Sequence, residues 1–392
     1  MVVVLFLKID RYVSDLHLHV FCPYKIHKRA NALEVWCMDR AHRKNIDNLR
    51  KLIKEDPMKK LFVLSMSLIM LLGSVTIGNA WWWDECKTKY PIVLVHGAFF
   101  RDKNMLGINY WWGIDNTLRQ KGAKVYVSNQ DPFNGVNPRT QQLANELAYQ
   151  YKLFGGPLYK FSKINMIAHS MGPLDSRNLI TNYAIPGVCA AGSCNSKVAT
   201  LTSISGTHKG SEVADVLYWA YNEIPILGPI VGDALTDLID VFGETFEMAG
   251  EQNTKLLLDN LISDFVINTF NPNTPNMPGV KYEAYGGKIN YINPAADLLG
   301  QTVAGVLYTV MNLMGAGDND GLVSLDSARI PALCKAGTTC SAPVWKGNME
   351  TSLLYPGVNH FYEINHFLGI TPGWNAKGFY VNVARDLKAR GY

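Results

Sequence analysis

The chain has 392 residues, of which 48% are hydrophobic and 18% charged, and its formal net charge is +4. The positive excess lies in the first 80 residues, because residues 81–392 hold 24 Lys and Arg against 26 Asp and Glu, a net charge of −2. These 312 residues suffice for one large α/β domain with a substantial core. They carry no excess of basic residues of the kind that a nucleic-acid partner requires, so we expect no such partner.

Residues 58–80 have the three parts of a secretory signal peptide. A basic start, Met58-Lys59-Lys60, is followed by an uncharged apolar run over 61–72 and by the small residues Gly78-Asn79-Ala80 at the cleavage position. We expect cleavage near Ala80, export through the periplasm and a mature protein that begins at Trp81. The alternative is an uncleaved membrane anchor, because the uncharged stretch 61–79 approaches the length that spans a bilayer.

Residues 1–57 precede this signal, although export signals stand at the N-terminus of a protein. They hold 11 Lys and Arg against 7 Asp and Glu and show no convincing periodicity. We interpret them as an upstream extension without a fold. If the signal is instead an uncleaved anchor, they become a cytosolic tail that its basic residues orient inward.

Five of the seven cysteines lie after residue 80. Cys189 and Cys194 are close enough in sequence to form a disulfide, as are Cys334 and Cys340, and an oxidising compartment permits both. Cys86 is then left over. A zinc site made by the four other cysteines is the alternative, but structural zinc sites use shorter spacings between their cysteines.

Expected strands and helices alternate from residue 90 onward. The apolar run from Tyr90 to Ala98 predicts a strand buried on both faces. It is followed by an expected helix over 111–121, a strand over 124–129, a helix over 139–154 and a strand over 162–169. This alternation predicts a parallel sheet with helices on both faces, in which ligands bind beyond the carboxyl ends of the strands.

The turn after the strand 162–169 carries the pattern of a nucleophile elbow, Ala168-His169-Ser170-Met171-Gly172. Small residues on either side of Ser170 let strand and helix pass closely while the serine adopts a strained backbone conformation. The helix that follows directs backbone N–H groups and a partial positive charge at an anion beside the serine. The rival interpretation is an ordinary strand-to-helix turn that contains a serine.

A second motif of the same edge is His96-Gly97-Ala98, where the first strand ends. Gly97 permits a sharp turn, after which the N–H of Ala98 can face the site. An apolar strand that ends in His-Gly, roughly 70 residues before the elbow serine, is typical of an oxyanion hole. We expect a structural role for His96 itself.

Further strands are expected over 198–205 and 279–288, with a terminal helix over 375–390. His208 follows the first of these strands, and we assign it a structural role. Residues 213–250 are rich in apolar and aromatic side chains and are interrupted by prolines and glycines. They form either an extra helical layer over the core or a mobile lid whose apolar face covers the site in water and meets lipid when open.

A serine hydroxyl is a poor nucleophile at neutral pH and needs a base, usually a histidine, that an acid orients. The sequence offers Ser170, then Asp320 in the loop 316–324, then His360, and this is the chain order of α/β-hydrolases. Two rivals stand close by, Asp318 for the acid and His366 for the base.

With these residues in place, residues 81–392 resemble the secreted true lipases of pseudomonads along nearly their whole length. The matching segments are YPIVLVHG, GINYWWGI, KVYV, AHSMG, GTHKGSEVAD, NPAADLLG, NDGLVS, NHFYEINHFLGI and the terminal helix. The resemblance implies an α/β-hydrolase fold with Ser170 as nucleophile, Asp320 as acid and His360 as base. It also implies that the backbone N–H groups of Ala98 and Met171 form the oxyanion hole.

The resemblance further implies a structural calcium ion near the base, held in relatives by two aspartates and two backbone carbonyl groups. Asp297 matches the first aspartate, and His366 and Ile370 stand where the carbonyl groups would come from. Tyr362 replaces the second aspartate, whereas calcium prefers about six to eight oxygen ligands that include carboxylates. We therefore expect no required cofactor and weak or absent calcium dependence, unless Glu363 supplies the missing carboxylate.

The sequence thus predicts a secreted triacylglycerol lipase, a serine hydrolase that cleaves acylglycerol esters at a lipid–water interface. The same residues would serve a phospholipase or a lipid acyltransferase, since the triad does not distinguish water from an alcohol as acceptor. An alternative of another class is a lipid-binding surface protein on a hydrolase fold, with 213–250 as its ligand-binding segment. A secretion system or a folding chaperone is a further expected partner, and we expect a monomer.

Overall fold

The computed structural model describes residues 5–7, 18–20, 84–98, 109–152, 161–223, 253–293, 298–366 and 371–392. The chain divides into two compact units, Met1–Asn79 and Ala80–Tyr392. In the first unit, β1 (Leu5–Leu7) pairs antiparallel with β2 (Leu18–Val20), a pairing that the sequence analysis did not predict. The predicted signal segment lies outside the described residues. Among the helices that the structure describes, none has the length and apolar character needed to cross a bilayer.

The second unit is built on one six-stranded sheet in which all neighbouring strands are parallel. In the spatial order of the sheet, the strands are β4 (Val125–Val127), β3 (Ile92–Val95), β5 (Ile164–His169), β6 (Val198–Ile204), β7 (Lys281–Gly287) and β8 (Val344–Met349). Every residue of β3, β5 and β6 is buried, as expected of central strands in a parallel sheet that is covered on both faces. The predicted parallel α/β sheet is confirmed.

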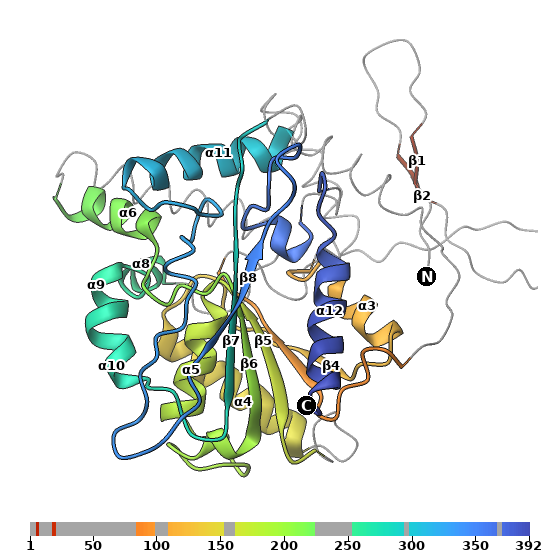
Figure 1. Ribbon diagram of the computed structural model, residues 1–392, viewed down its shortest axis with the longest axis vertical. Helices are drawn as coiled ribbons and strands as arrows, with labels where there is room; N and C mark the ends of the chain where they lie inside the picture. The colour runs from red at the N-terminus through yellow and green to blue at the C-terminus, as the bar shows by residue number, and fades with distance from the viewer. Residues whose placement is uncertain are drawn as a thin grey trace, which may run out of the picture. The chain divides into compact units, whose positions relative to one another are not determined.

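Helices cover both faces of this sheet (Figure 1). On one face, α4 (Val136–Lys152) and α5 (Gly172–Asn182) share a hydrophobic core with alternate residues of the strands, such as Val93 and Met166. On the other face lie α3 (Ile114–Gln120) and α12 (Ala376–Ala389), where Phe379 contacts Tyr285 edge-on with ring centroids 5.0 Å apart. The alternation of strands and helices has therefore produced the two-faced arrangement that the sequence predicts.

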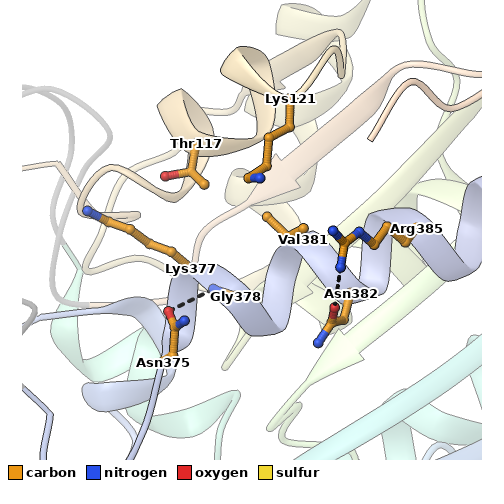
Figure 2. A pocket seen from close by; sticks show the side chains of 8 residues that line it. All are labelled: Thr117, Lys121, Asn375, Lys377, Gly378, Val381, Asn382 and Arg385. Carbon is orange, nitrogen blue, oxygen red and sulfur yellow. Dashed lines mark hydrogen bonds between the residues drawn. The ribbon is translucent and has the colours of Figure 1, made fainter. Parts of the chain in front are cut away.

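A pocket of about 340 Å³ lies between α3 and α12 (Figure 2). It is lined by Thr117, Lys121, Asn375, Lys377, Gly378, Val381, Asn382 and Arg385. Two of its cations, Lys121 and Arg385, both contact the carboxylate of Glu85. None of the predicted catalytic residues lines this pocket, so it is separate from the chemistry argued below.

The remaining helices follow the carboxyl ends of the later strands. They include α6 (Glu212–Glu223) after β6 and α11 (Leu298–Leu313) after β7, which contact each other at one end of the sheet in Figure 1. Between them come α8 (Thr254–Asp259), α9 (Ser263–Phe265), the π-helix η2 (Val266–Phe270) and α10 (Asn271–Asn273). Short 3-10 helices are η1 (Cys194–Lys197) and η3 (Tyr362–Ile364). Residues 224–250 of the predicted lid lie outside the described residues.

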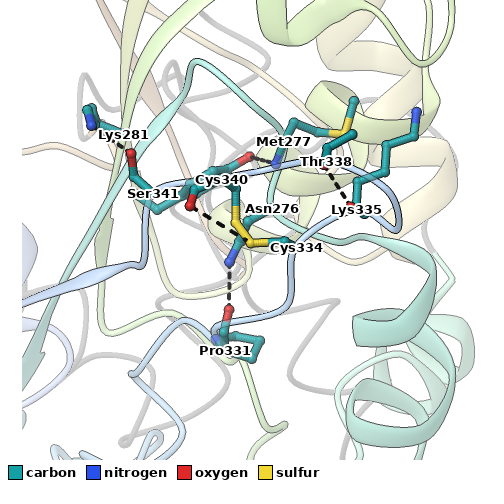
Figure 3. Close-up of a disulfide and its surroundings, with 10 residues drawn as sticks. Asn276, Met277, Lys281, Pro331, Cys334, Lys335, Thr338, Cys340 and Ser341 are labelled. Atoms are coloured by element: carbon teal, nitrogen blue, oxygen red, sulfur yellow. Dashed lines mark hydrogen bonds between the residues drawn. A yellow bond between two sulfur atoms is a disulfide. The ribbon is translucent and has the colours of Figure 1, made fainter.

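Both predicted disulfides are present. Cys189 pairs with Cys194 and Cys334 with Cys340, with Cα separations of 5.2 and 5.6 Å. Figure 3 shows the second pair beside Asn276, whose side-chain amide donates a 2.7 Å hydrogen bond to the Pro331 carbonyl. The four-cysteine zinc site is therefore wrong. Cys86 is free and buried, and burial raises the pKa of its thiol to about 11.

Candidate active site

The turn between β5 and α5 carries the strain that a nucleophile elbow requires. Ser170 has a φ of +61°, in the left-handed region that a non-glycine residue adopts at a cost. Its N–H donates a 3.0 Å hydrogen bond to the Ile204 carbonyl on β6, which fixes the turn. Gly172 allows the close approach, because an added Cβ would lie 2.5 Å from the Val95 carbonyl oxygen. Ala168 fills the first small position and is fully buried.

The end of β3 lies against this turn. Val95 pairs with Ala168 across the parallel ladder, so the two chains reach the carboxyl edge of the sheet together. A Cβ added to Gly97 would lie 2.5 Å from the Ser170 Cβ. Ala98 directly follows Gly97, and Met171 directly follows Ser170 at the start of α5. Ala98 and Met171, the two predicted oxyanion donors, therefore each follow one of the two residues that touch, Gly97 and Ser170.

A buried ion pair holds the end of β3 in place. Arg139 on α4 donates to the Asp175 carboxylate on α5, from Nε at 2.9 Å, and both side chains are fully buried. Its Nη2 donates to the His96 carbonyl at 2.8 Å. Burial raises the pKa of Asp175 to about 7, although the Arg139 charge opposes this shift. The pair thus ties both helices of one sheet face to the residue that precedes Gly97.

The loop after α11 and the segment after β8 bring an acid and a base together. Asp320 Oδ2 and His360 Nδ1 are 2.8 Å apart and buried. The other carboxylate oxygen accepts N–H groups from Leu322 at 2.9 Å and Val323 at 2.8 Å. Burial raises the pKa of Asp320, but His360 and these two donors outweigh it, so the pKa lies below its ordinary value of 3.8. Asp320 is thereby kept ionised beside the imidazole.

The His360 ring stands next to the elbow. It lies against the ring of His169, the residue before Ser170, with ring centroids 4.4 Å apart and ring planes tilted by 38°. The two rivals lie elsewhere: Asp318 is exposed and accepts a 2.8 Å hydrogen bond from Lys288, and His366 Nε2 is 2.9 Å from the Tyr110 carbonyl. Of the four candidates, the structure therefore joins Asp320 with His360.

A buried hydrogen-bond chain behind the elbow was not predicted as part of the site. The Tyr110 hydroxyl lies 2.6 Å from His169 Nδ1, and His169 Nε2 lies 2.8 Å from Glu363 Oε2. The hydroxyl also contacts the Gly97 backbone, so the hydrogen-bond chain runs from the end of β3 through His169 to Glu363. Sequence reasoning weighed Glu363 only as a calcium ligand. Glu363 follows His360 by three residues and lies in η3, and this short spacing is the sequence signal that could have placed its side chain near the base.

Glu363 is fully buried and has a further partner in Ser205. Its Oε1 accepts a 2.7 Å hydrogen bond from Ser205 Oγ, which itself accepts the Gly287 N–H. Burial and the neighbouring Asp320 raise the pKa of Glu363 well above 4.5. Burial also lowers the pKa of His169 well below 6.5, with His360 and His366 acting in the same direction. In this hydrogen-bond chain, burial therefore favours the neutral forms of Glu363 and His169, whereas Asp320 beside them is ionised.

His208 is buried in a different network. Its Nε2 lies 2.9 Å from Ser203 Oγ and its Nδ1 lies 3.4 Å from the Arg177 guanidinium. Burial and that guanidinium lower the pKa of His208 well below 6.5. These contacts agree with the structural role assigned to it from the sequence.

Several known proteins are similar to this chain, although no protein-family model matches it. A triacylglycerol lipase from Pseudarthrobacter phenanthrenivorans is 29% identical over 333 residues, covering 74% of this chain and 92% of the relative. One from Burkholderia plantarii is also 29% identical over 333 residues, covering 74% and 82%. Another from Pseudomonas fragi is 32% identical over 160 residues, covering 41% and 48%.

Solved structures share the fold. Staphylococcus hyicus lipase matches with a TM-score of 0.53 at 18% identity, over 79% of this chain and 98% of that one. EstA from Clostridium botulinum matches with a TM-score of 0.52 at 18% identity, over 88% and 97%. The chain has the α/β-hydrolase fold, and its sequence is similar to bacterial triacylglycerol lipases. The strained serine and the paired acid and base therefore lie on a fold that this chain shares with lipases.

The residues of the implied calcium site fit that ion poorly in this chain. Tyr362, which replaces an aspartate, is fully buried. Glu363 already binds His169 and Ser205, so an ion would have to displace these contacts. Asp297 and Ile370 lie outside the described residues. With the second carboxylate absent, we derive no chemistry from calcium.

Proposed function

We propose that this lipase hydrolyses the carboxylic esters of acylglycerols with Ser170 as nucleophile, His360 as base and Asp320 as acid. The relatives named triacylglycerol lipases support the substrate class. The observation that carries the proposal is the 2.8 Å contact between Asp320 and His360, beside the strained turn of Ser170. A phospholipase or an acyltransferase would use the same residues on another ester or acceptor.

In the proposed reaction, the Ser170 hydroxyl attacks the ester carbonyl carbon and its proton passes to Nε2 of His360. Asp320 accepts the Nδ1–H and stabilises the imidazolium. The N–H groups of Ala98 and Met171 stabilise the negative oxygen of the tetrahedral intermediate. The leaving alcohol takes the proton from His360, and water then repeats the sequence to release the fatty acid.

The proposal includes export of the protein after cleavage near Ala80. The apolar segment 58–80 supports it, and so do two disulfides, which persist in oxidising compartments. N-terminal sequencing of protein from the culture medium tests the cleavage. A protein that keeps residues 58–80 and stays with the membrane would favour the anchored alternative.

The central test combines labelling with substrate comparison. A fluorophosphonate should label the wild-type chain at Ser170 and leave Ser170→Ala unlabelled, because the serine must be activated to react. The wild type should release fatty acid from triacylglycerols faster than from phospholipids of the same chain length. Faster phospholipid cleavage, or ester transfer to an added alcohol in place of hydrolysis, would favour the rival enzymes. Absence of labelling would point to a lipid-binding protein.

A further inference from the structure

The pocket between α3 and α12 has the size and the lining of a binding site for an anion. Its volume of about 340 Å³ lies within the range of about 300 to 1,000 Å³ that small-molecule sites occupy. Three of its lining residues are cations, Lys121, Lys377 and Arg385, and none of its lining residues is an acid. None of them belongs to the proposed catalytic site, so an inference about this pocket does not depend on the proposed function.

The segments around the pocket carry a positive charge that the rest of the unit does not share. Residues 84–90 pack on the ends of both helices, since the Cys86 N–H donates to the Lys121 carbonyl at 2.8 Å and the Lys89 N–H to the Tyr392 carbonyl at 2.6 Å. Together with 114–121 and 375–392, they hold eight Lys and Arg against four Asp and Glu, a net charge of +4. Because 81–392 as a whole has a net charge of −2, the pocket lies where the electrostatic potential favours an anion.

The cations stand at opposite ends of the pocket. Lys377, in the first turn of α12, lies beside the start of α3, because a Cβ added to Gly113 would be 3.4 Å from its Nζ. Lys121 and Arg385 lie at the end of α3 and share the carboxylate of Glu85. Lys377 and Arg385 are eight residues apart on one helix, which is about 12 Å along its axis. A ligand that contacts both ends must therefore be elongated.

The acids near the pocket leave positive charge at both ends. Glu85 is one carboxylate for two cations, so Lys121 and Arg385 together keep one positive charge. Lys377 makes no ion pair with any acid in the part of the chain that the structure describes. The other acids of these segments have cations of their own: Asp84 pairs with Lys87, Asp115 with Arg119, and Asp386 with Lys346 and Arg390.

The polar residues of the pocket offer hydrogen-bond donors. Asn375 Oδ1 accepts the Gly378 N–H at 2.9 Å, and Asn382 Oδ1 accepts a 3.3 Å hydrogen bond from Arg385, as the dashed lines in Figure 2 show. With these oxygens engaged, the side-chain amides have their N–H groups left for a ligand. The planar guanidinium of Arg385 can also bind two oxygens of one phosphate group.

We propose that this pocket binds a small linear polyanion of the oligophosphate class, with one phosphate group at Lys377 and another between Lys121 and Arg385. A single phosphate contacts one end only, whereas a chain of three phosphates has charge to place at both ends. The bound polyanion ties α3 to α12 and competes with Glu85 for its two cations.

The first experiment compares two anions by isothermal titration calorimetry of the full chain. Inorganic tripolyphosphate should bind at least about tenfold more tightly than inorganic phosphate, because it engages two sites at once. EDTA in every sample removes any effect of metal chelation by tripolyphosphate. Its affinity should fall several-fold when NaCl rises from about 0.05 M to about 0.3 M, since the contact is electrostatic. Equal affinities of the two anions, or no binding of tripolyphosphate at low salt, would overturn the proposal.

Two substitutions should change the affinity for tripolyphosphate in opposite directions. Lys377→Gln removes the cation of one end and should weaken binding at least about fivefold. Glu85→Gln removes the competing carboxylate and should tighten binding at least about threefold, a gain that a purely structural role of Glu85 would not produce. Wild-type affinity in Lys377→Gln, or weaker binding in a folded Glu85→Gln, would contradict the proposed position of the ligand.

Lys197→Gln is the matched control. Lys197 is also a half-buried lysine without an ion pair to any acid among the described residues, but it precedes β6 and does not line the pocket. Its substitution should leave the affinity for tripolyphosphate within about twofold of wild type. A loss equal to that of Lys377→Gln would show a general attraction to surface charge and would overturn the proposal.

Melting curves provide an independent measurement. Tripolyphosphate at about ten times its Kd should raise the melting temperature of the wild type by about 2 °C, because it binds the folded chain. NaCl at the same ionic strength should not produce this rise, and the same tripolyphosphate concentration should produce less than half of it in Lys377→Gln. Near-UV circular dichroism of that variant should match the wild type, since only an incompletely buried side chain changes. An equal rise in both chains would place the anion elsewhere.

Discussion

Gly97 and Ser170 are in direct contact, so that a Cβ added to the glycine would fall 2.5 Å from the Cβ of the serine. The same Cβ would lie 2.7 Å from the Tyr110 hydroxyl, which binds His169. Gly97 therefore lies where the end of β3, the turn at Ser170 and the Tyr110 hydroxyl meet, and no room is left there for a side chain. No other residue type can hold these three parts at these distances without displacing one of them.

Gly97→Ala should accordingly damage catalysis more than stability. The new methyl group must push the elbow or the end of β3, and a displacement of about 1 Å in such a site can lower kcat by about 100-fold. Overpacking should cost roughly 1 to 3 kcal/mol of unfolding free energy. Soluble-ester kinetics and urea unfolding measure the two effects.

Gly279→Ala is the control for this substitution. Gly279 has a φ of +79° and no neighbour within 4 Å of an added Cβ. Alanine there should cost about 1 kcal/mol from backbone strain and leave kcat unchanged. Equal kinetics in the two variants would contradict the packing argument at Gly97.

Asp320→Asn should lower kcat on a soluble ester by about 10⁴-fold, because an amide cannot stabilise the imidazolium of His360. Asparagine keeps an oxygen for the N–H groups of Leu322 and Val323, so the loop should stay folded. Asp318→Asn is the matched control two residues away, and it loses only a bond to Lys288 at the surface. Retention of activity in the first variant, or loss in the second, would reverse the assignment of the acid.

Much of the sheet could be predicted because its central strands are buried on both faces. β3 is a continuous apolar run and β5 and β6 are mostly apolar, a pattern that does not depend on which strand lies beside them. β8 escaped prediction because Val344–Met349 contains a lysine and a glycine, and only its last residue is fully buried. α11 escaped because it has no charged residues, so its sequence lacks the polar face of an amphipathic helix.

The proposed site divides in the same way. The elbow and the end of β3 are local patterns, in which small residues and a serine stand a few positions apart. Glu363 joins His169 and Ser205, which are 194 and 158 positions away in the sequence. Such contacts follow from the three-dimensional fold, and no local pattern reveals them. The choice of Asp320 over Asp318 came from the family resemblance and not from spacing, since both lie in one short loop.

Arg139→Met should destabilise the fold and slow the reaction. It leaves the Asp175 carboxylate buried without its partner, which should cost about 3 to 5 kcal/mol. It also frees the His96 carbonyl, so the chain that leads to Gly97 loses its anchor. Urea unfolding and soluble-ester kinetics at a temperature well below the transition should show both losses. A double variant with Asp175→Leu should recover stability but not kcat, and full recovery of both would contradict the anchoring role.

Calcium removal tests the poor fit of the implied metal site. Because Tyr362 replaces a carboxylate and Glu363 is bound to His169, an added chelator should leave the melting temperature unchanged. Differential scanning calorimetry with EDTA and with excess calcium measures this. Tyr362→Asp should restore a carboxylate at that position and make the melting temperature rise with calcium. A large fall in the wild type on chelation would show that other residues hold the ion.

Glu363→Gln should change how stability depends on pH. Because burial and Asp320 raise the folded-state pKa of Glu363 well above the unfolded value of about 4.5, its contribution is complete below pH 4.5 and falls as pH rises toward the folded pKa. Glutamine does not titrate, so the wild type should lose stability relative to Glu363→Gln by at most about 1.4 kcal/mol per pH unit. Urea unfolding between about pH 5 and pH 8 measures the difference. A flat difference between wild type and Glu363→Gln over this pH range would refute the raised pKa.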